Sequence, residues 1–195
     1  GSGASGDMFG FNVAIEGDTI AIGAPRDGGS GAAYVYTRIA GEWHEQQNLK
    51  AMPAVSGASF GSALAVSGDT LIVGASDDGT EMAKAGSAYV FTRSAGGWTQ
   101  TQRFTADPID AHASFGYALA ISGDRLLVGA PRYASIATPV STAPGEVFAF
   151  QRNGATWRQT QRLRAMLPRA SDSFGSSVAL RVDAALVGSC GEANG

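Results

Sequence analysis

One stretch of this 195-residue chain decides its fold: residues 60–75, which read Phe-Gly-Ser-Ala-Leu-Ala-Val-Ser-Gly-Asp-Thr-Leu-Ile-Val-Gly-Ala. Two apolar runs are joined here by Gly68-Asp69. A Gly-Asp pair in that position predicts a tight hairpin, because Gly supplies the positive φ of a type I′ or II′ turn. The second run is apolar at consecutive positions, Leu71-Ile72-Val73, which predicts a strand with both faces buried.

The same pattern recurs along the chain, and each occurrence opens with Phe-Gly: Phe9-Gly10, Phe60-Gly61, Phe115-Gly116 and Phe174-Gly175. Fourteen residues after each Phe stands a glycine that precedes a small residue: Gly23, Gly74, Gly129 and Gly188. Successive repeats are 51, 55 and 59 residues long. A period of this size predicts an array of supersecondary units, each of which needs its neighbour to cover an apolar face.

Two further strands complete each unit. The third strand carries aromatic residues two apart: Tyr34 and Tyr36, Tyr89 and Phe91, Phe148 and Phe150. The fourth strand begins at a tryptophan: Trp43, Trp98 or Trp157. One alternating set of this strand is wholly polar, as in His44, Gln46 and Asn48, which protects an outer sheet edge from pairing with other chains. Four antiparallel strands of this kind make one β-propeller blade.

The predicted fold class is therefore all-β, with β-propeller blades of four antiparallel strands in a partial ring. It has three full blades plus the first two strands of a fourth. We expect a single domain over residues 1–195, with repeats at approximately 7–57, 58–112, 113–171 and 172–195. The fourth repeat has Val182-Asp183 in place of Gly-Asp. A β-branched residue resists positive φ, so a different or frayed turn is predicted there.

Only one segment of the repeat varies in length. From the glycine before the small residue to the first aromatic of the third strand the counts are 11, 15 and 19. From that aromatic to the tryptophan the count is always 9, and from the tryptophan to the next Phe-Gly it is always 17. Fixed spacing is typical of a hydrogen-bonded ladder, because one inserted residue turns every later side chain to the other face. The variable segment is a surface loop.

Composition excludes several classes of function. A net charge of −3 with interspersed acidic and basic residues gives no footprint for nucleic acid. No apolar run approaches the ~20 residues of a membrane span, so no membrane insertion is expected. The single cysteine, Cys190, excludes an internal disulfide. We expect no cofactor.

The assembled motifs resemble those of FG-GAP repeat proteins, which include the integrin α-subunit β-propeller and many bacterial secreted or surface proteins. The bacterial form is the more similar, on residues 89–93 (Tyr-Val-Phe-Thr-Arg) and 97–100 (Gly-Trp-Thr-Gln). The resemblance implies an extracellular or cell-surface location in a bacterium. Integrin-type repeats often bind calcium between the first two strands. Here that place holds only Gly17-Asp18, Gly68-Asp69 or Gly123-Asp124, and calcium needs about six to eight oxygens. We therefore expect no metal.

Other residues that could carry chemistry have a simpler structural interpretation. Trp43, Trp98 and Trp157 could form an aromatic ligand cage, but their fixed register favours packing. His44 and His112 have no motif partner for metal binding or general-base catalysis, and solvated histidines are the default interpretation.

The variable loops are the predicted partner-binding surface, since the resemblance implies that this face of an integrin-like propeller binds partners. The candidate contact residues are Asp77, Asp78, Glu81, Arg132, Tyr133 and Ile136. An Arg-Tyr pair beside aliphatic residues is typical of an interface anchor. In the alternative interpretation, Asp77-Asp78 form a turn, and the apolar residues of the third loop pin it to its own blade.

The first functional hypothesis is a non-catalytic extracellular module for protein interaction or adhesion. The alternatives are a glycan-binding propeller, in which Trp98 and Gln100 or Gln102 hold a sugar, and an accessory propeller domain of a larger secreted enzyme. Catalysis needs convergent titratable groups near the axis. The sequence offers mainly Asn12, Ser62, Tyr117 and Ser176 there, which argues against catalysis within these blades. Exposed blade flanks could also support self-association.

Overall fold

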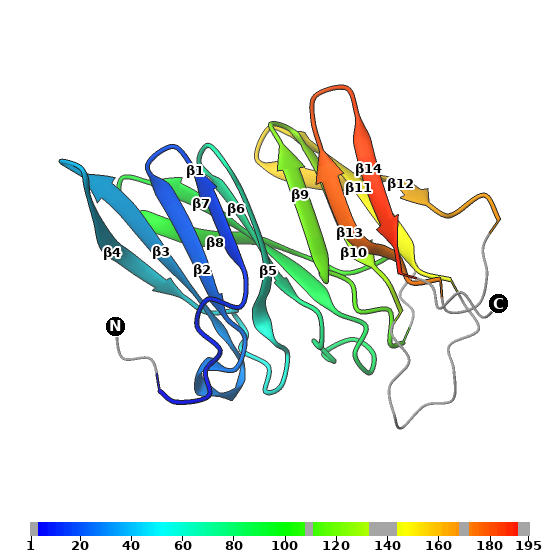
Figure 1. Ribbon diagram of the computed structural model, residues 1–195, viewed down its shortest axis with the longest axis horizontal. Helices are drawn as coiled ribbons and strands as arrows, with labels where there is room; N and C mark the ends of the chain where they lie inside the picture. Colours follow the sequence, from blue (N-terminus) through cyan, green and yellow to red (C-terminus); the bar gives the residue numbers. More distant parts are fainter. Residues whose placement is uncertain (1–3, 108–110, 133–143, 168–171, 191–195) are drawn as a thin grey trace.

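The computed structural model describes residues 4–107, 111–132, 144–167 and 172–190. It contains four antiparallel sheets in chain order, which we call blades 1 to 4 (Figure 1). Blades 1 to 3 have four strands each and blade 4 has two, which confirms the predicted fold class. The strands are β1 (Val13–Glu16), β2 (Thr19–Ala24), β3 (Ala32–Ile39) and β4 (Glu42–Leu49); β5 (Phe60–Ser67), β6 (Thr70–Ala75), β7 (Ser87–Ser94) and β8 (Gly97–Phe104); β9 (Ala118–Ser122), β10 (Arg125–Ala130), β11 (Glu146–Asn153) and β12 (Thr156–Leu163); β13 (Phe174–Leu180) and β14 (Ala185–Ser189).

The Gly-Asp pairs form the two-residue turns between the first two strands of blades 1 to 3. Gly17, Gly68 and Gly123 have φ of 55°, 55° and 56°. The aspartates that follow are not among the described residues with positive φ, and this pattern is that of a type II′ turn. In blade 4 the turn is different, as predicted: Val182 also lacks a positive φ, and β13 and β14 pair only as far as Leu180 and Ala185.

Each turn aspartate forms an ion pair with an arginine of the third strand in its own blade. The Nε–Oδ1 distances are 2.8 Å for Arg93 and Asp69 and 2.5 Å for Arg152 and Asp124, and Arg38 pairs with Asp18 at 2.7 Å. The guanidinium also lies over the tryptophan ring of the fourth strand. The turn carboxylates therefore already have cationic partners.

Blades meet where the glycine at the end of one second strand contacts the Phe-Gly glycine of the next blade. A Cβ added to Gly74 would lie 2.1 Å from the carbonyl oxygen of Gly116. Gly23 and Gly129 have the same relationship to Gly61 and Gly175. Any side chain here would push the blades apart, which explains why both glycines of the motif recur.

Two apolar clusters fill the space between successive blades. Between blades 1 and 2, Val35 and Leu49 pack with the side chains of Phe60, Tyr89 and Trp98. Between blades 2 and 3, a second cluster places Phe115 and Trp157 among apolar residues of both blades. The motif phenylalanines contact their own third strands edge to face, with ring centroids 5.4 Å apart for both Phe60–Tyr89 and Phe115–Phe148.

The fourth strands correct one expectation from the sequence. A bulge between β3 and β4 leaves Gln46 without a ladder partner, because Tyr36 pairs with Glu45 and Val35 pairs with Gln47. Thr101 and Thr160 are the extra residues in blades 2 and 3. Because each bulge shifts the alternation by one residue, the polar set does not share one face.

Blade 1 exposes the face that the preceding blade covers in blades 2 and 3. Phe9, Val13 and Ile15 are exposed, and Trp43 is 37% exposed where Trp98 and Trp157 are each 3% exposed. The three tryptophans occupy the same strand position, so the difference comes from the neighbouring blade alone. Among the described residues, no helix reaches the length and hydrophobicity that a membrane crossing requires.

Candidate functional site

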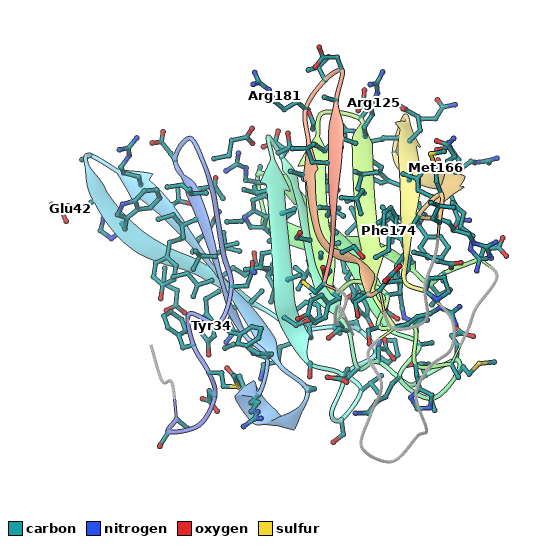
Figure 2. The ribbon with its side chains drawn as sticks, turned by 45° about the vertical axis from the view of Figure 1, so that its right-hand side comes forward. Tyr34, Glu42, Arg125, Met166, Phe174 and Arg181 are labelled. Carbon is teal, nitrogen blue, oxygen red and sulfur yellow. The ribbon has the colours of Figure 1, made fainter. Side chains whose placement is uncertain are left out.

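In blades 1 and 2, the loop between the second and third strands lies on the same rim as the loop that precedes the next Phe-Gly (lower edge in Figure 1). Backbone hydrogen bonds join the two sets: Gly57 N donates to Gly29 O at 2.7 Å, and His112 N donates to Ala83 O at 2.9 Å. We call this edge the loop rim. Tyr34 lies toward it, whereas Arg125 and Arg181 lie at the opposite rim, which carries the hairpins (Figure 2).

The blade 2 loop, residues 76–86, is built around the buried carboxylate of Asp78. This side chain is 0% exposed. It accepts hydrogen bonds from the backbone N–H of Thr80 at 2.9 Å, from the Thr80 hydroxyl at 2.5 Å and from the Tyr89 hydroxyl at 2.8 Å. Arg103 Nη2 lies 3.3 Å from its second oxygen. Burial raises the pKa of Asp78, but these hydrogen bonds outweigh it and lower the pKa to about 2.

This geometry corrects the prediction that Asp78 contacts a partner, since its carboxylate faces inward and holds the turn. Asp77 is more open: its side chain is 37% exposed, and it binds the Ser59 hydroxyl at 2.8 Å and Lys84 Nζ at 3.4 Å. Glu81 is 46% exposed and pairs with Arg103 at 3.0 Å. Arg132 is partly buried and lies two residues after the end of β10. Tyr133 and Ile136 lie outside the described residues.

Blade 1 has Asp27 in the sequence position of Asp78, and blade 3 uses Glu146 at the start of β11 for a similar set of ion pairs. In blade 1, Asp27 accepts a hydrogen bond from the Tyr34 hydroxyl and pairs with Lys50 Nζ at 3.2 Å. In blade 3, Glu146 pairs with Arg162 at 2.6 Å and with Arg164 at 2.7 Å. Sequence reasoning missed these pairs. The available signal was an acidic residue in every variable loop or at its end, together with a basic residue near the end of every fourth strand.

A cavity of about 540 Å³ opens on the axial side of the loop rim. Its walls include residues that directly follow the Phe-Gly pairs in all four repeats: Phe11, Asn12, Ser62, Tyr117 and Ser176. Four of the cavity residues, Asn12, Ser62, Tyr117 and Ser176, are those that the sequence placed near the axis. Arg26 and Asp77, which begin equivalent loops of blades 1 and 2, also line it.

The sugar site suggested by sequence is not available in this structure. Trp98 is 3% exposed. Gln100 exchanges two hydrogen bonds with the backbone of Met52, and Gln102 exchanges two with the backbone of Trp157. All three side chains are therefore occupied in contacts between blades.

The described part of the chain holds no group of three His, Cys, Asp or Glu residues arranged for a metal ion. His44 is exposed on β4. His112 is partly buried rather than solvated, and its Nδ1 has no hydrogen-bond partner among the described residues. The two imidazoles come from different blades and do not form a shared centre.

A family model for the FG-GAP repeat matches residues 1–36, 43–91, 98–150 and 157–195. The chain belongs to the FG-GAP repeat family. Three of its FG-GAP matches begin at Trp43, Trp98 or Trp157, and three end at the second aromatic of a third strand. The family repeat therefore begins in the outer strand of one blade and continues into the next. Comparison with curated proteins finds no significant match.

Proposed function

We propose that this FG-GAP protein is a non-catalytic, secreted or cell-surface module of a bacterium that binds another protein through its loop rim. One observation carries the proposal. Strand spacing is fixed in every blade, whereas the loops on this rim differ in length and charge. A rigid scaffold with divergent loops on one edge is the usual arrangement of a recognition surface.

The blade 2 loop is the best-defined candidate for the contact. The Asp78 hydrogen bonds and the Arg103–Glu81 ion pair hold it from below. Met82 is 43% exposed beside the partly exposed Glu81. A preorganised loop loses little conformational entropy on binding, so more of its contact energy contributes to affinity.

The test uses two matched double variants. E81A/M82A removes one acidic and one large apolar side chain from the loop rim, and I39A/E42A removes the same types from the hairpin rim, where Ile39 is 60% exposed. Each protein is measured by surface plasmon resonance against a panel of purified extracellular-matrix and bacterial envelope proteins. We expect at least one saturable interaction that E81A/M82A weakens tenfold or more and I39A/E42A leaves unchanged. Equal effects of both variants, or binding to no panel protein, would count against the loop rim.

A second role, as an accessory domain of a larger secreted enzyme, is compatible with the same surface. In that case the protein bound by the loop rim belongs to the same polypeptide or complex. The matched variants distinguish this role, because the loop-rim variant then changes association with the enzyme and not binding to the panel.

A further inference from the structure

The position after each Phe-Gly glycine alternates in chemistry around the axis. In blade order it is Phe11, Ser62, Tyr117 and Ser176. These residues lie in or directly before the first strand of each blade. The first strands, β1, β5, β9 and β13, follow one another along the inner side of the array (Figure 1). The alternation places an aromatic ring on each side of a hydroxyl. Elsewhere in the ladder the equivalent residues are closely similar, as in Val13, Leu64, Leu119 and Val178.

Both aromatic side chains leave surface open although they lie at the cavity. Phe11 is 55% exposed and Tyr117 is 40% exposed. Polar groups stand between and beside them: the Asn12 amide, whose Oδ1 accepts from Leu64 N at 3.1 Å, and the Ser62 hydroxyl. The Ser62 hydroxyl donates to Gly74 O and accepts from Ser76 N, both at 3.4 Å, and keeps one lone pair for a ligand donor. The Asn12 Nδ2 group makes no hydrogen bond with any residue that the structure describes, so its N–H donors can serve a ligand. Ligand sites of ~300–1,000 Å³ that combine apolar walls with a few polar groups are typical of small-molecule recognition.

Of the two charged side chains that line the cavity, Asp77 and Arg26, only one lacks a partner among the described residues. Asp77 already binds Ser59 and Lys84. Arg26 is exposed, and its side chain makes no hydrogen bond or ion pair with any residue that the structure describes. The available charge is therefore positive. A guanidinium offers a planar fork of donors that suits a carboxylate.

From these features we propose that the axial cavity binds an acidic saccharide, with its carboxylate on Arg26, its ring beside Tyr117 or Phe11, and its hydroxyls on Asn12, Ser62 and Asp77. A sugar ring has an apolar C–H face that packs on an aromatic ring, and hydroxyls that both donate and accept. Each Asp77 oxygen already has one donor, Ser59 or Lys84, and keeps a further lone pair. A sugar hydroxyl can donate to that lone pair, whereas an acidic peptide side chain only accepts. This inference concerns the axis and is independent of the proposed protein contact at the loop rim.

The test measures binding of glucuronate and galacturonate, with glucose and galactose as neutral counterparts, by ligand-observed NMR and calorimetry in 0.15 M salt. We expect the uronates to bind at least about tenfold more tightly than the neutral sugars, the effect typical of a hydrogen bond to a charged group. R26Q should reduce this ratio to about one. R158Q removes another exposed arginine outside the cavity and should leave the ratio unchanged. Y117A should weaken uronates and neutral sugars by a similar factor, about two- to tenfold.

Three results would overturn the proposal. The first is no uronate binding at millimolar concentration by a protein with the wild-type melting temperature. The second is uronate binding that R26Q and R158Q affect equally. The third is Arg26-dependent binding of a tetra-aspartate peptide without uronate binding, which would assign the cavity to an acidic peptide instead. The loop-rim variant E81A/M82A should retain uronate binding, so failure of either proposal is recognisable separately.

Discussion

Gln47 of blade 1 and Trp98 of blade 2 exchange two hydrogen bonds across the interface between their blades. Trp98 N donates to Gln47 Oε1 at 2.7 Å, and Gln47 Nε2 donates to Trp98 O at 2.9 Å. Gln102 and Trp157 repeat the arrangement between blades 2 and 3, at 2.9 and 2.8 Å. In each case the side-chain amide of a glutamine pairs with the backbone of the next blade's fourth strand, as a peptide group of a neighbouring strand would. The glutamine occupies the residue after the bulge, so the bulge directs it toward the next blade.

Replacing Gln47 by alanine should destabilise the protein by about 1–3 kcal/mol, because a partly buried N–H and carbonyl of Trp98 lose their partners. Urea unfolding monitored by circular dichroism measures this free energy. Gln161 has the same position in blade 3 and pairs with Ala149 in the ladder, but its side chain makes no hydrogen bond with a described residue. Gln161→Ala should therefore change stability by less than about 0.5 kcal/mol. Similar losses from both substitutions would contradict the contribution of the inter-blade contact.

The tryptophans provide a second matched pair. Trp98→Ala should cost about 3–5 kcal/mol, because it opens a cavity between blades 1 and 2. Trp43→Ala should cost much less, because its ring is 37% exposed against 3% for Trp98. Differential scanning calorimetry at matched concentrations compares the two. A larger loss from Trp43→Ala would mean that its exposed face is covered in solution, as self-association through the blade 1 flank would produce.

Gly74→Ala should separate blades 2 and 3, since its Cβ would lie 2.1 Å from the carbonyl oxygen of Gly116. Overpacking of this kind costs about 1–3 kcal/mol or more. Gly96→Ala is the control, because the nearest atom to that Cβ is Ser94 Oγ at 4.0 Å. Thermal unfolding should show a lower melting temperature for the first variant only. If Gly74→Ala does not fold, a soluble yield well below that of Gly96→Ala supports the same conclusion.

Asp78 should make the free energy of unfolding depend on pH in the acidic range. Its pKa in the folded protein is lowered to about 2 from an ordinary 3.8. A lowered pKa means that the stabilisation is complete above about pH 4 and is lost as pH falls toward 2, by on the order of 2 kcal/mol. Asp78→Asn should be less stable at neutral pH and should lack this part of the acid dependence. Asp183→Asn, at an exposed turn, should retain the wild-type profile in urea titrations at each pH.

Calcium should leave the melting temperature unchanged within about 1 °C, because the turn aspartates are paired with Arg38, Arg93 and Arg152 and a two-residue turn cannot supply the six to eight oxygens that calcium needs. Differential scanning fluorimetry with calcium and with a chelator measures this. A rise of several degrees that Asp18→Ala abolishes would show that a hairpin binds the ion.

The residues of the candidate site show where sequence reasoning ends. The repeat pattern placed Asn12, Ser62, Tyr117 and Ser176 near the axis, and the structure gathers them around one cavity. It did not distinguish Asp77 from its neighbour Asp78, although one carboxylate is 37% exposed and the other 0% exposed. Nor did it assign Gln100 and Gln102 to blade contacts, because their hydrogen-bond partners lie 48 and 55 residues away.

The sequence by itself determined the strands, their antiparallel order and the number of blades. These follow from local causes: turn glycines with positive φ and a ladder spacing that tolerates no insertion. Only the tertiary structure decided which copy of a repeated residue is buried, where the bulges turn the fourth strands, and which side chains share the axial cavity. Those properties depend on contacts with the neighbouring blade. Trp43 and Trp98 have the same local sequence pattern, so the pattern alone does not distinguish the exposed ring from the buried one.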